Sequence, residues 1–284
     1  MNSDIMECYL QAGKIASEVK EETLKTVKEG GKLLETAEYV EDLILQKGGK
    51  LAFPCNISVN QIASHYTPLY GRSKFKTGDV VKIDLGAHID GYIADTAATT
   101  EVGTDRNNIL IKAANEALNA AISQTMHGVN TKHLGSIMGK IIKSYGCNPV
   151  KDLTGHSLDR FTIHSGINIP NYGGAPYGNT LYAGDVIAIE PFTTKGRGRI
   201  IQGEARIYSL RQTKNLSNPL YQKLESKFKK LPFTSRWLTD QSEIKKTQSL
   251  LKKYPVLIES DGCPVAQAEH TVIVMEQGCK VITA

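Results

Sequence analysis

Two seven-residue segments of the sequence follow the same residue pattern, and each ends in an acidic residue. The first reads Gly-Asp-Val-Val-Lys-Ile-Asp and ends at Asp84, and the second reads Gly-Asp-Val-Ile-Ala-Ile-Glu and ends at Glu190. A shorter match joins Ala-Asp-Thr around Asp95 to Ala-Glu-His around Glu269. The two matches together indicate a duplicated unit whose halves face each other across a pseudo-twofold axis.

These four acids have the chemistry of a metal site. A carboxylate buried among apolar residues loses its hydration, so burial is costly unless its charge is compensated. Four converging carboxylates would need about two divalent cations to balance them. His156, in Thr-Gly-His-Ser, could add a nitrogen ligand. Solvated acids on an exposed hairpin explain the first pair equally well, and a histidine beside glycine is more often structural. The duplication shifts the balance toward the metal site.

The first pair of acids flanks the dipeptide Asp90-Gly91, which is a typical hairpin turn. With a two-residue turn, Asp84 lies opposite Ala97, and Asp95 lies two residues along on the same face of the strand pair. A three-residue turn would instead place the two acids on opposite faces.

The elements that position these acids follow from hydrophobic periodicity. We expect two helices in the first 47 residues, separated by Gly30-Gly31, a third from about Asp105 to Met126, and a fourth after Asn130-Thr131. Runs rich in Val and Ile, at 80–85 and 186–189, predict strands. The pattern is that of an α+β fold.

Composition is that of an ordinary globular protein, with 284 residues of which 40% are hydrophobic and 22% charged. Charged residues recur through residues 1–20, which excludes a signal peptide, and no stretch approaches the roughly 18 to 20 apolar residues of a membrane span. The five cysteines are scattered and are expected to be reduced thiols. We expect a cytoplasmic protein with no membrane partner.

A basic segment lies between the acids of the second pair, which are separated by 78 residues against 10 for the first pair. Residues 205–258 contain 12 Lys and Arg but only 3 Asp and Glu. We expect residues 205–262 to form an inserted basic helical subdomain, and residues 1–204 with 263–284 to form the catalytic domain.

Six short motifs follow one another along the chain. They are Ala52-Phe53-Pro54-Cys55, Ser64-His65-Tyr66-Thr67-Pro68, Lys82-Ile83-Asp84-Leu85-Gly86, Thr154-Gly155-His156-Ser157, Ile163-His164-Ser165-Gly166 and Ala268-Glu269-His270-Thr271. As a set they resemble the type 2 methionine aminopeptidases of the pita-bread fold, and the basic insertion resembles the helical subdomain of that type. The resemblance implies an antiparallel sheet covered by helices, with two duplicated half-domains. The sequence shows no acidic or basic N-terminal extension, so the short archaeal-like form is expected.

The same resemblance implies a centre of two divalent metal ions. Asp84 would hold one ion, Asp95 and Glu269 would bridge both, and His156 with Glu190 would complete the second. Oxygen and imidazole ligands suit several ions, so Co, Mn, Fe(II) and Zn all remain open.

The resemblance also implies roles in substrate binding and catalysis. His65 and His164 resemble histidines that contact the substrate, and either could stabilise the developing oxyanion. Phe53, Ile163 and Tyr254 resemble residues that line the methionine pocket. The carboxylate at position 190 would act as general base in removing N-terminal methionine from nascent polypeptides.

Several alternatives stay open at this stage. A proline-directed aminopeptidase of the same fold is one, although such relatives usually carry a large preceding domain. A non-catalytic pita-bread protein that binds RNA or the ribosome is another, although such proteins have lost metal ligands that are all present here. The basic insertion could contact the ribosome transiently through phosphate groups, or it could simply be a solvated face. A monomer is expected.

Overall fold

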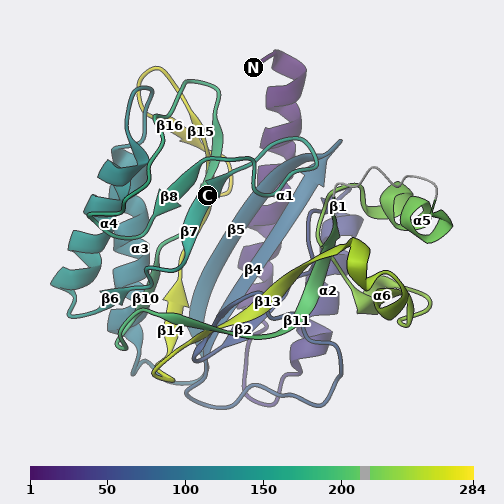
Figure 1. Ribbon diagram of the computed structural model, residues 1–284. Coiled ribbons are helices and arrows are strands. Elements are labelled where there is room, and N and C mark those ends of the chain that lie inside the picture. Colours follow the sequence, from purple (N-terminus) through teal and green to yellow (C-terminus); the bar gives the residue numbers. More distant parts are fainter. Residues whose placement is uncertain (212–217) are drawn as a thin grey trace.

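The computed structural model describes residues 1–211 and 218–284, which form helices packed on the outside of antiparallel sheets (Figure 1). The prediction of an α+β fold is confirmed. Within the described residues, no helix is long and apolar enough to cross a membrane.

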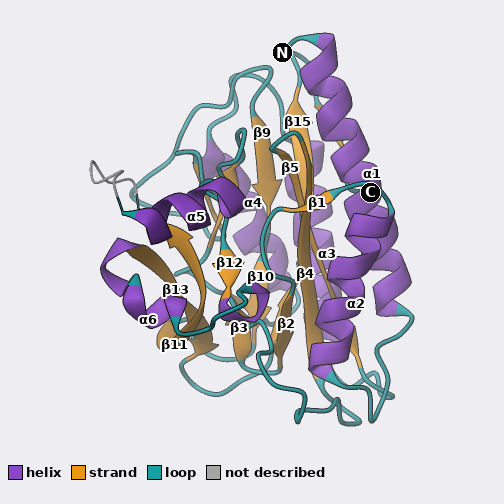
Figure 2. Cartoon of the chain, turned by 90° about the vertical axis from the view of Figure 1, so that its right-hand side faces the viewer, coloured by secondary structure: helices purple, strands orange, loops and turns teal. Residues whose placement is uncertain are grey.

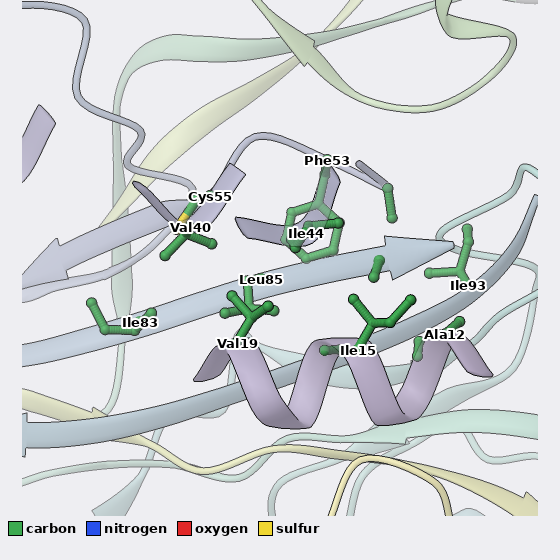
Figure 3. Packing of buried hydrophobic residues seen from close by; sticks show 14 of the residues in the cluster. Ala12, Ile15, Val19, Val40, Ile44, Phe53, Cys55, Ile83, Leu85 and Ile93 are labelled. Atoms are coloured by element: carbon green, nitrogen blue, oxygen red, sulfur yellow. The ribbon is translucent and has the colours of Figure 1, made fainter. Parts of the chain in front are cut away.

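The first half of the chain packs two helices against a four-stranded sheet. Its elements are α1 (Ser3–Leu24), α2 (Leu33–Gln46), β1 (Lys50–Leu51), β2 (Asn56–Val59), β4 (Val80–Ile89) and β5 (Tyr92–Glu101). Apolar residues recur at helical intervals along α1, so that Ile15 and Val19 share one buried face. They pack with Ile83 and Leu85 of β4 in the core of this half (Figure 3).

The hairpin between β4 and β5 has the predicted register. Asp90 and Gly91 both have positive φ, at 50° and 92°, as the two-residue type I′ turn requires. Asp84 pairs with Ala97, and Asp95 lies two residues before Ala97 on β5. Since side chains alternate along a strand, the two carboxylates point to the same face.

The second half repeats the plan with two helices and two small sheets. Its elements are α3 (Asn108–Ser123), α4 (Thr131–Ser144), β6 (Asn148–Pro149), β7 (Thr154–Ser157), β8 (Asn168–Pro170), β9 (Val186–Ile189), β10 (Phe192–Thr194), β14 (Val265–Gln267), β15 (His270–Val274) and β16 (Cys279–Val281). Asn130 caps α4 by accepting a hydrogen bond from the Lys132 amide. Leu110 of α3 and Leu134 of α4 share a second core with Ile187 of β9.

The two halves join where β5 meets the start of β15. The amide of Glu269 donates to the carbonyl of Ala97 at 2.9 Å, and the Thr96 hydroxyl donates to the carbonyl of Glu269 at 2.8 Å. One residue pair further, the amide of Asp95 donates to the hydroxyl of Thr271 at 2.8 Å. This seam places an acid of the first half beside an acid of the second.

A third unit covers one side of this framework (Figure 2). It consists of β3 (Ile62–Ser64), β11 (Ile200–Leu210), α5 (Pro219–Phe228), β12 (Phe233–Thr234), α6 (Glu243–Lys246) and β13 (Leu251–Glu259), with single 3-10 turns at Ser235–Trp237 and Gln248–Leu250. The ends of the expected helical insertion are therefore strands, because β11 and β13 pair with each other and β13 pairs with β3. The helices lie between these strands and have a small core of their own, which includes Leu224, Phe228 and Phe233.

Candidate active site

One cavity of about 60 Å³ collects every site residue that the sequence predicted. Its walls include Phe53, His65, Asp84, Asp95, His156, Ile163, His164, Glu190, Tyr254 and Glu269. Four further residues complete the lining, namely Asn56, Ser64, Ile207 and Pro232. The cavity has room for on the order of four water-sized spheres.

The acids reach this cavity from four different strands or strand ends. Asp84 and Asp95 come from the β4–β5 hairpin. Glu190 follows β9 directly, at the point where Pro191 has no amide hydrogen to continue the ladder, and Glu269 lies just before β15. Because each half delivers two acids to the seam, the duplicated framework accounts for their convergence.

His156 lies among these acids. It is paired with Ala188 of β9, so its side chain lies on the same face as Glu190 two residues on. Its Nε2 is 3.3 Å from Glu190 Oε1 and 3.7 Å from Asp95 Oδ2. Ligand atoms of Asp95, His156 and Glu269 all lie within 4.8 Å of one another, a spacing at which they could hold one metal ion.

The electrostatics of the cavity favour a bound cation. Burial raises the pKa of Asp84 to about 7, and burial together with mutual repulsion raises the pKa values of Asp95, Glu190 and Glu269 well above the usual range. Across residues 1–211 and 218–284, no Lys or Arg forms an ion pair with any of the four. The Oδ1 atom of Asp95 is buried without a hydrogen-bond partner in the same residues. Divalent ions would supply the missing charge, and this donor set fits them.

Two amide side chains hold the carboxylates in place, and sequence reasoning missed both. Asn56 Nδ2 donates to Asp84 Oδ2 at 3.2 Å, and Gln267 Nε2 donates to Glu269 Oε2 at 3.2 Å and to Glu190 Oε2 at 3.4 Å. Such contacts fix the orientation of acids that bind metal. Asn56 lies directly opposite Asp84 in the β2–β4 pairing, a relation that appears only once the strands are paired.

His65 and His164 lie together at one side of the cavity. The ring of His164 is 4.4 Å from that of His156 and 6.2 Å from that of Tyr254, centroid to centroid. Burial lowers the pKa of His65 to about 4 and that of His164 further, so both are neutral near pH 7. His65 has a φ of 62°, an uncommon conformation for a non-glycine residue that is typical of functional sites.

The tautomer of His65 follows from its contact with the backbone. Its Nδ1 lies 3.2 Å from the carbonyl oxygen of Pro255. Because a carbonyl only accepts hydrogen bonds, Nδ1 carries the proton of the neutral ring, and Nε2 is left as an acceptor.

The remaining wall of the cavity is apolar. Phe53 and Ile163, which the sequence predicted, are joined by Ile207 of β11 and by Pro232, which follows α5. The ring of Phe53 packs directly on Gly86, where any side chain would overlap it. The unit formed by β11, α5 and β13 therefore supplies part of the wall.

The fold and the cavity define a metal-dependent hydrolase, and comparison with known proteins gives the family. The family model described as "Metallopeptidase family M24" matches residues 7–275, so the chain belongs to this family. The chain is 42% identical to a methionine aminopeptidase of Methanothermobacter thermautotrophicus, over 98% of this chain and 99% of that protein. It is also 42% identical to a methionine aminopeptidase of Methanocaldococcus jannaschii, over 98% of each chain. The predicted resemblance to the archaeal methionine aminopeptidases is confirmed.

Solved structures with lower identity share the fold. A thermophilic Arx1 superposes with a TM-score of 0.89 at 21% identity, covering 99% of this chain and 91% of that one. A methionine aminopeptidase from Thermotoga maritima gives 0.77 at 24% identity, covering 100% and 98%. A prolidase from Pyrococcus furiosus gives 0.66 at 22% identity, and 64% of that chain is covered. The predicted pita-bread fold is confirmed.

Proposed function

We propose that this chain removes the N-terminal methionine from nascent polypeptides by hydrolysing the first peptide bond. The observation that carries the proposal is one cavity with four buried acids and a histidine at one end and an apolar wall at the other. The 42% identity, over 98% of this chain, to proteins named methionine aminopeptidase supports it.

We assign the metal ligands as the resemblance implies. Asp84 would hold one of two divalent ions, Asp95 and Glu269 would contribute to both sites, and His156 with Glu190 would complete the second site. The short approach of His156 Nε2 to Glu190 and Asp95 supports this division. When bound, such ions lower the pKa of a water molecule toward neutrality and polarise a carbonyl. Co, Mn, Fe(II) and Zn each suit the donors.

The remaining catalytic roles belong to three side chains of the cavity. Glu190 takes the proton from the attacking water and passes it to the leaving amine. His164 donates a hydrogen bond to the developing oxyanion, which in a dry site contributes a few kcal/mol. His65 accepts from a substrate N–H through Nε2, because its Nδ1 hydrogen is engaged by Pro255.

Specificity comes from the free amine and from shape. A free amino terminus would serve as a ligand of the divalent ions, which an internal peptide bond cannot imitate. Phe53, Ile163 and Tyr254 line the space for the methionine side chain.

The test is hydrolysis of Met-Ala-Ser, Leu-Ala-Ser and Ala-Pro-Ser by the metal-reconstituted enzyme. We expect Met-Ala-Ser to have the highest kcat/KM, and Glu190→Gln to lower kcat by at least about 100-fold. A preference for Ala-Pro-Ser would instead support the proline-directed alternative. Undiminished activity of Glu190→Gln would refute the assigned base.

We further propose that residues 205–262 act as an inserted subdomain on a catalytic domain of residues 1–204 and 263–284, in a monomeric cytoplasmic enzyme. Its excess of lysine suits a transient contact with ribosomal RNA near emerging chains. Charge reversal at Lys227, Lys229 and Lys230 should abolish co-sedimentation with ribosomes at low salt. Unchanged co-sedimentation would reject the contact.

A further inference from the structure

A second cavity, of about 480 Å³, adjoins the candidate active site. The two cavities share three wall residues, Ile163, His164 and Tyr254. By contrast, the cavity of about 530 Å³ beside α5 shares only Pro232 with the active site. The second cavity is therefore the natural continuation for a peptide whose first residue occupies the active site.

The far walls of this cavity are cationic. They carry Arg211, which follows β11, Lys230 after α5 and Lys252 on β13, and no acidic residue is among the lining residues that the structure describes. All three are exposed, and in the described part of the chain none forms an ion pair with a carboxylate. Lys252 Nζ lies 4.7 Å from the centroid of the Tyr254 ring, which places its charge at the junction of the two cavities.

The two adjoining cavities thus differ in the charged groups that line them. The active site gathers four acids, whereas the adjoining cavity gathers three cations. An extended peptide advances about 3.3 Å per residue, so a substrate whose amino terminus lies among the acids extends its third and following residues toward the cations. A chain with negative side chains at these positions is complementary to the cationic walls.

We infer that the enzyme selects substrates with acidic side chains at the third and fourth positions, and that Lys230 and Lys252 are the residues that determine this preference. The inference rests on the proposed aminopeptidase function and names the class of substrate that the site favours.

The test compares three pentapeptides with the metal-reconstituted enzyme, namely Met-Ala-Glu-Glu-Ser, Met-Ala-Ser-Ser-Ser and Met-Ala-Lys-Lys-Ser. We expect kcat/KM for the Glu peptide to exceed that for the Ser peptide about fivefold, as two exposed ion pairs would give, and the Lys peptide to be worse than the Ser peptide. The difference should lie in KM, and it should shrink toward unity at about 0.5 M salt because the pairs are screened.

The variant Lys230→Glu/Lys252→Glu should reverse the order of the three peptides. Lys253→Glu is the matched control, because this exposed neighbour on β13 lines a different cavity. It makes the same charge change as Lys252→Glu and should leave the order intact. Reversal by the control would show a general charge effect and overturn the inference.

The tripeptide Met-Ala-Ser separates this inference from the function on which it rests. If the wild-type enzyme cleaves Met-Ala-Ser but treats the three pentapeptides alike, only the substrate preference is wrong. If it does not cleave Met-Ala-Ser, the proposed function itself fails. The assay contains no ribosomes, so any ribosome contact of Lys230 does not enter the result.

Discussion

A buried ion pair fastens the covering unit to the first half, and its removal should destabilise the protein strongly. Glu41 of α2 accepts hydrogen bonds from Arg236 Nη1 at 2.7 Å and Nη2 at 2.8 Å, and from Trp237 Nε1 at 2.8 Å. The amide of Cys55 donates to the same carboxylate at 3.1 Å. The side chains of Glu41 and Arg236 are 7% and 12% exposed, so the pair is largely withdrawn from water.

The expected cost follows from this burial. Glu41→Ala leaves the guanidinium of Arg236 buried without a counter-charge, which typically lowers the free energy of unfolding by about 3 to 5 kcal/mol. The entropy of unfolding is about 2.1 cal/mol/K per residue, so 284 residues give roughly 0.6 kcal/mol/K. The melting temperature should therefore fall by about 5 to 8 °C.

Differential scanning calorimetry of the metal-reconstituted protein measures this change. Asp42→Asn is the matched control, since Asp42 is the exposed neighbour on the same helix and should melt like the wild type. The double variant Glu41→Ala/Arg236→Met should recover part of the lost melting temperature, because it also removes the unpaired charge of Arg236. A melting temperature of Glu41→Ala within about 1 °C of the wild type would refute the reasoning.

Three further outcomes are expected. When metal is added back to protein that a chelator has stripped of metal, the free energy of unfolding should rise by about 2.7 kcal/mol at a free metal concentration of 100 times the dissociation constant. A melting temperature that does not change with added metal would argue against the site. The pKa of His88 is lowered to about 4 by burial, and its Nδ1 accepts from the Gly91 amide at 3.0 Å. The unfolded chain therefore binds the proton first, and stability present above about pH 6.5 is lost as the pH falls toward 4, by about 1 to 2 kcal/mol between pH 7.5 and 5. Urea midpoints of the wild type and His88→Asn should converge over this range, and parallel curves would contradict the assignment. Gly86→Ala should displace the ring of Phe53, lower the free energy of unfolding by about 1 to 3 kcal/mol and raise KM for Met-Ala-Ser. If the variant has the same KM as the wild type, the ring is free to move.

Much of the site could be predicted because its acids lie in repeated local contexts. The turn Asp90-Gly91 determines the register of its own hairpin, so the shared face of Asp84 and Asp95 follows from nearby residues alone. Asn130 likewise marks the start of α4 through a local hydrogen bond.

The parts that escaped prediction depend on pairing between distant segments. Gln267 reaches Glu190 only because β14 and β10 lie side by side, and no local pattern signals that arrangement. The strands at the ends of residues 205–262 were also missed. Basic composition and helical spacing describe the middle of that segment, whereas β11 and β13 exist through pairing with each other and with β3.

The seam between β5 and β15 also bears on how the protein reaches its active form. The hydrogen bonds that close it join residues 173 and 176 positions apart, such as Thr96 with Glu269 and Asp95 with Thr271. Contacts of such separation form late and slowly, because a long loop must close before they contribute. The chain is therefore expected to gain metal affinity in one step near the end of folding. During synthesis, the first half can fold as it emerges, but no hydrolytic site exists until Glu269 has joined it.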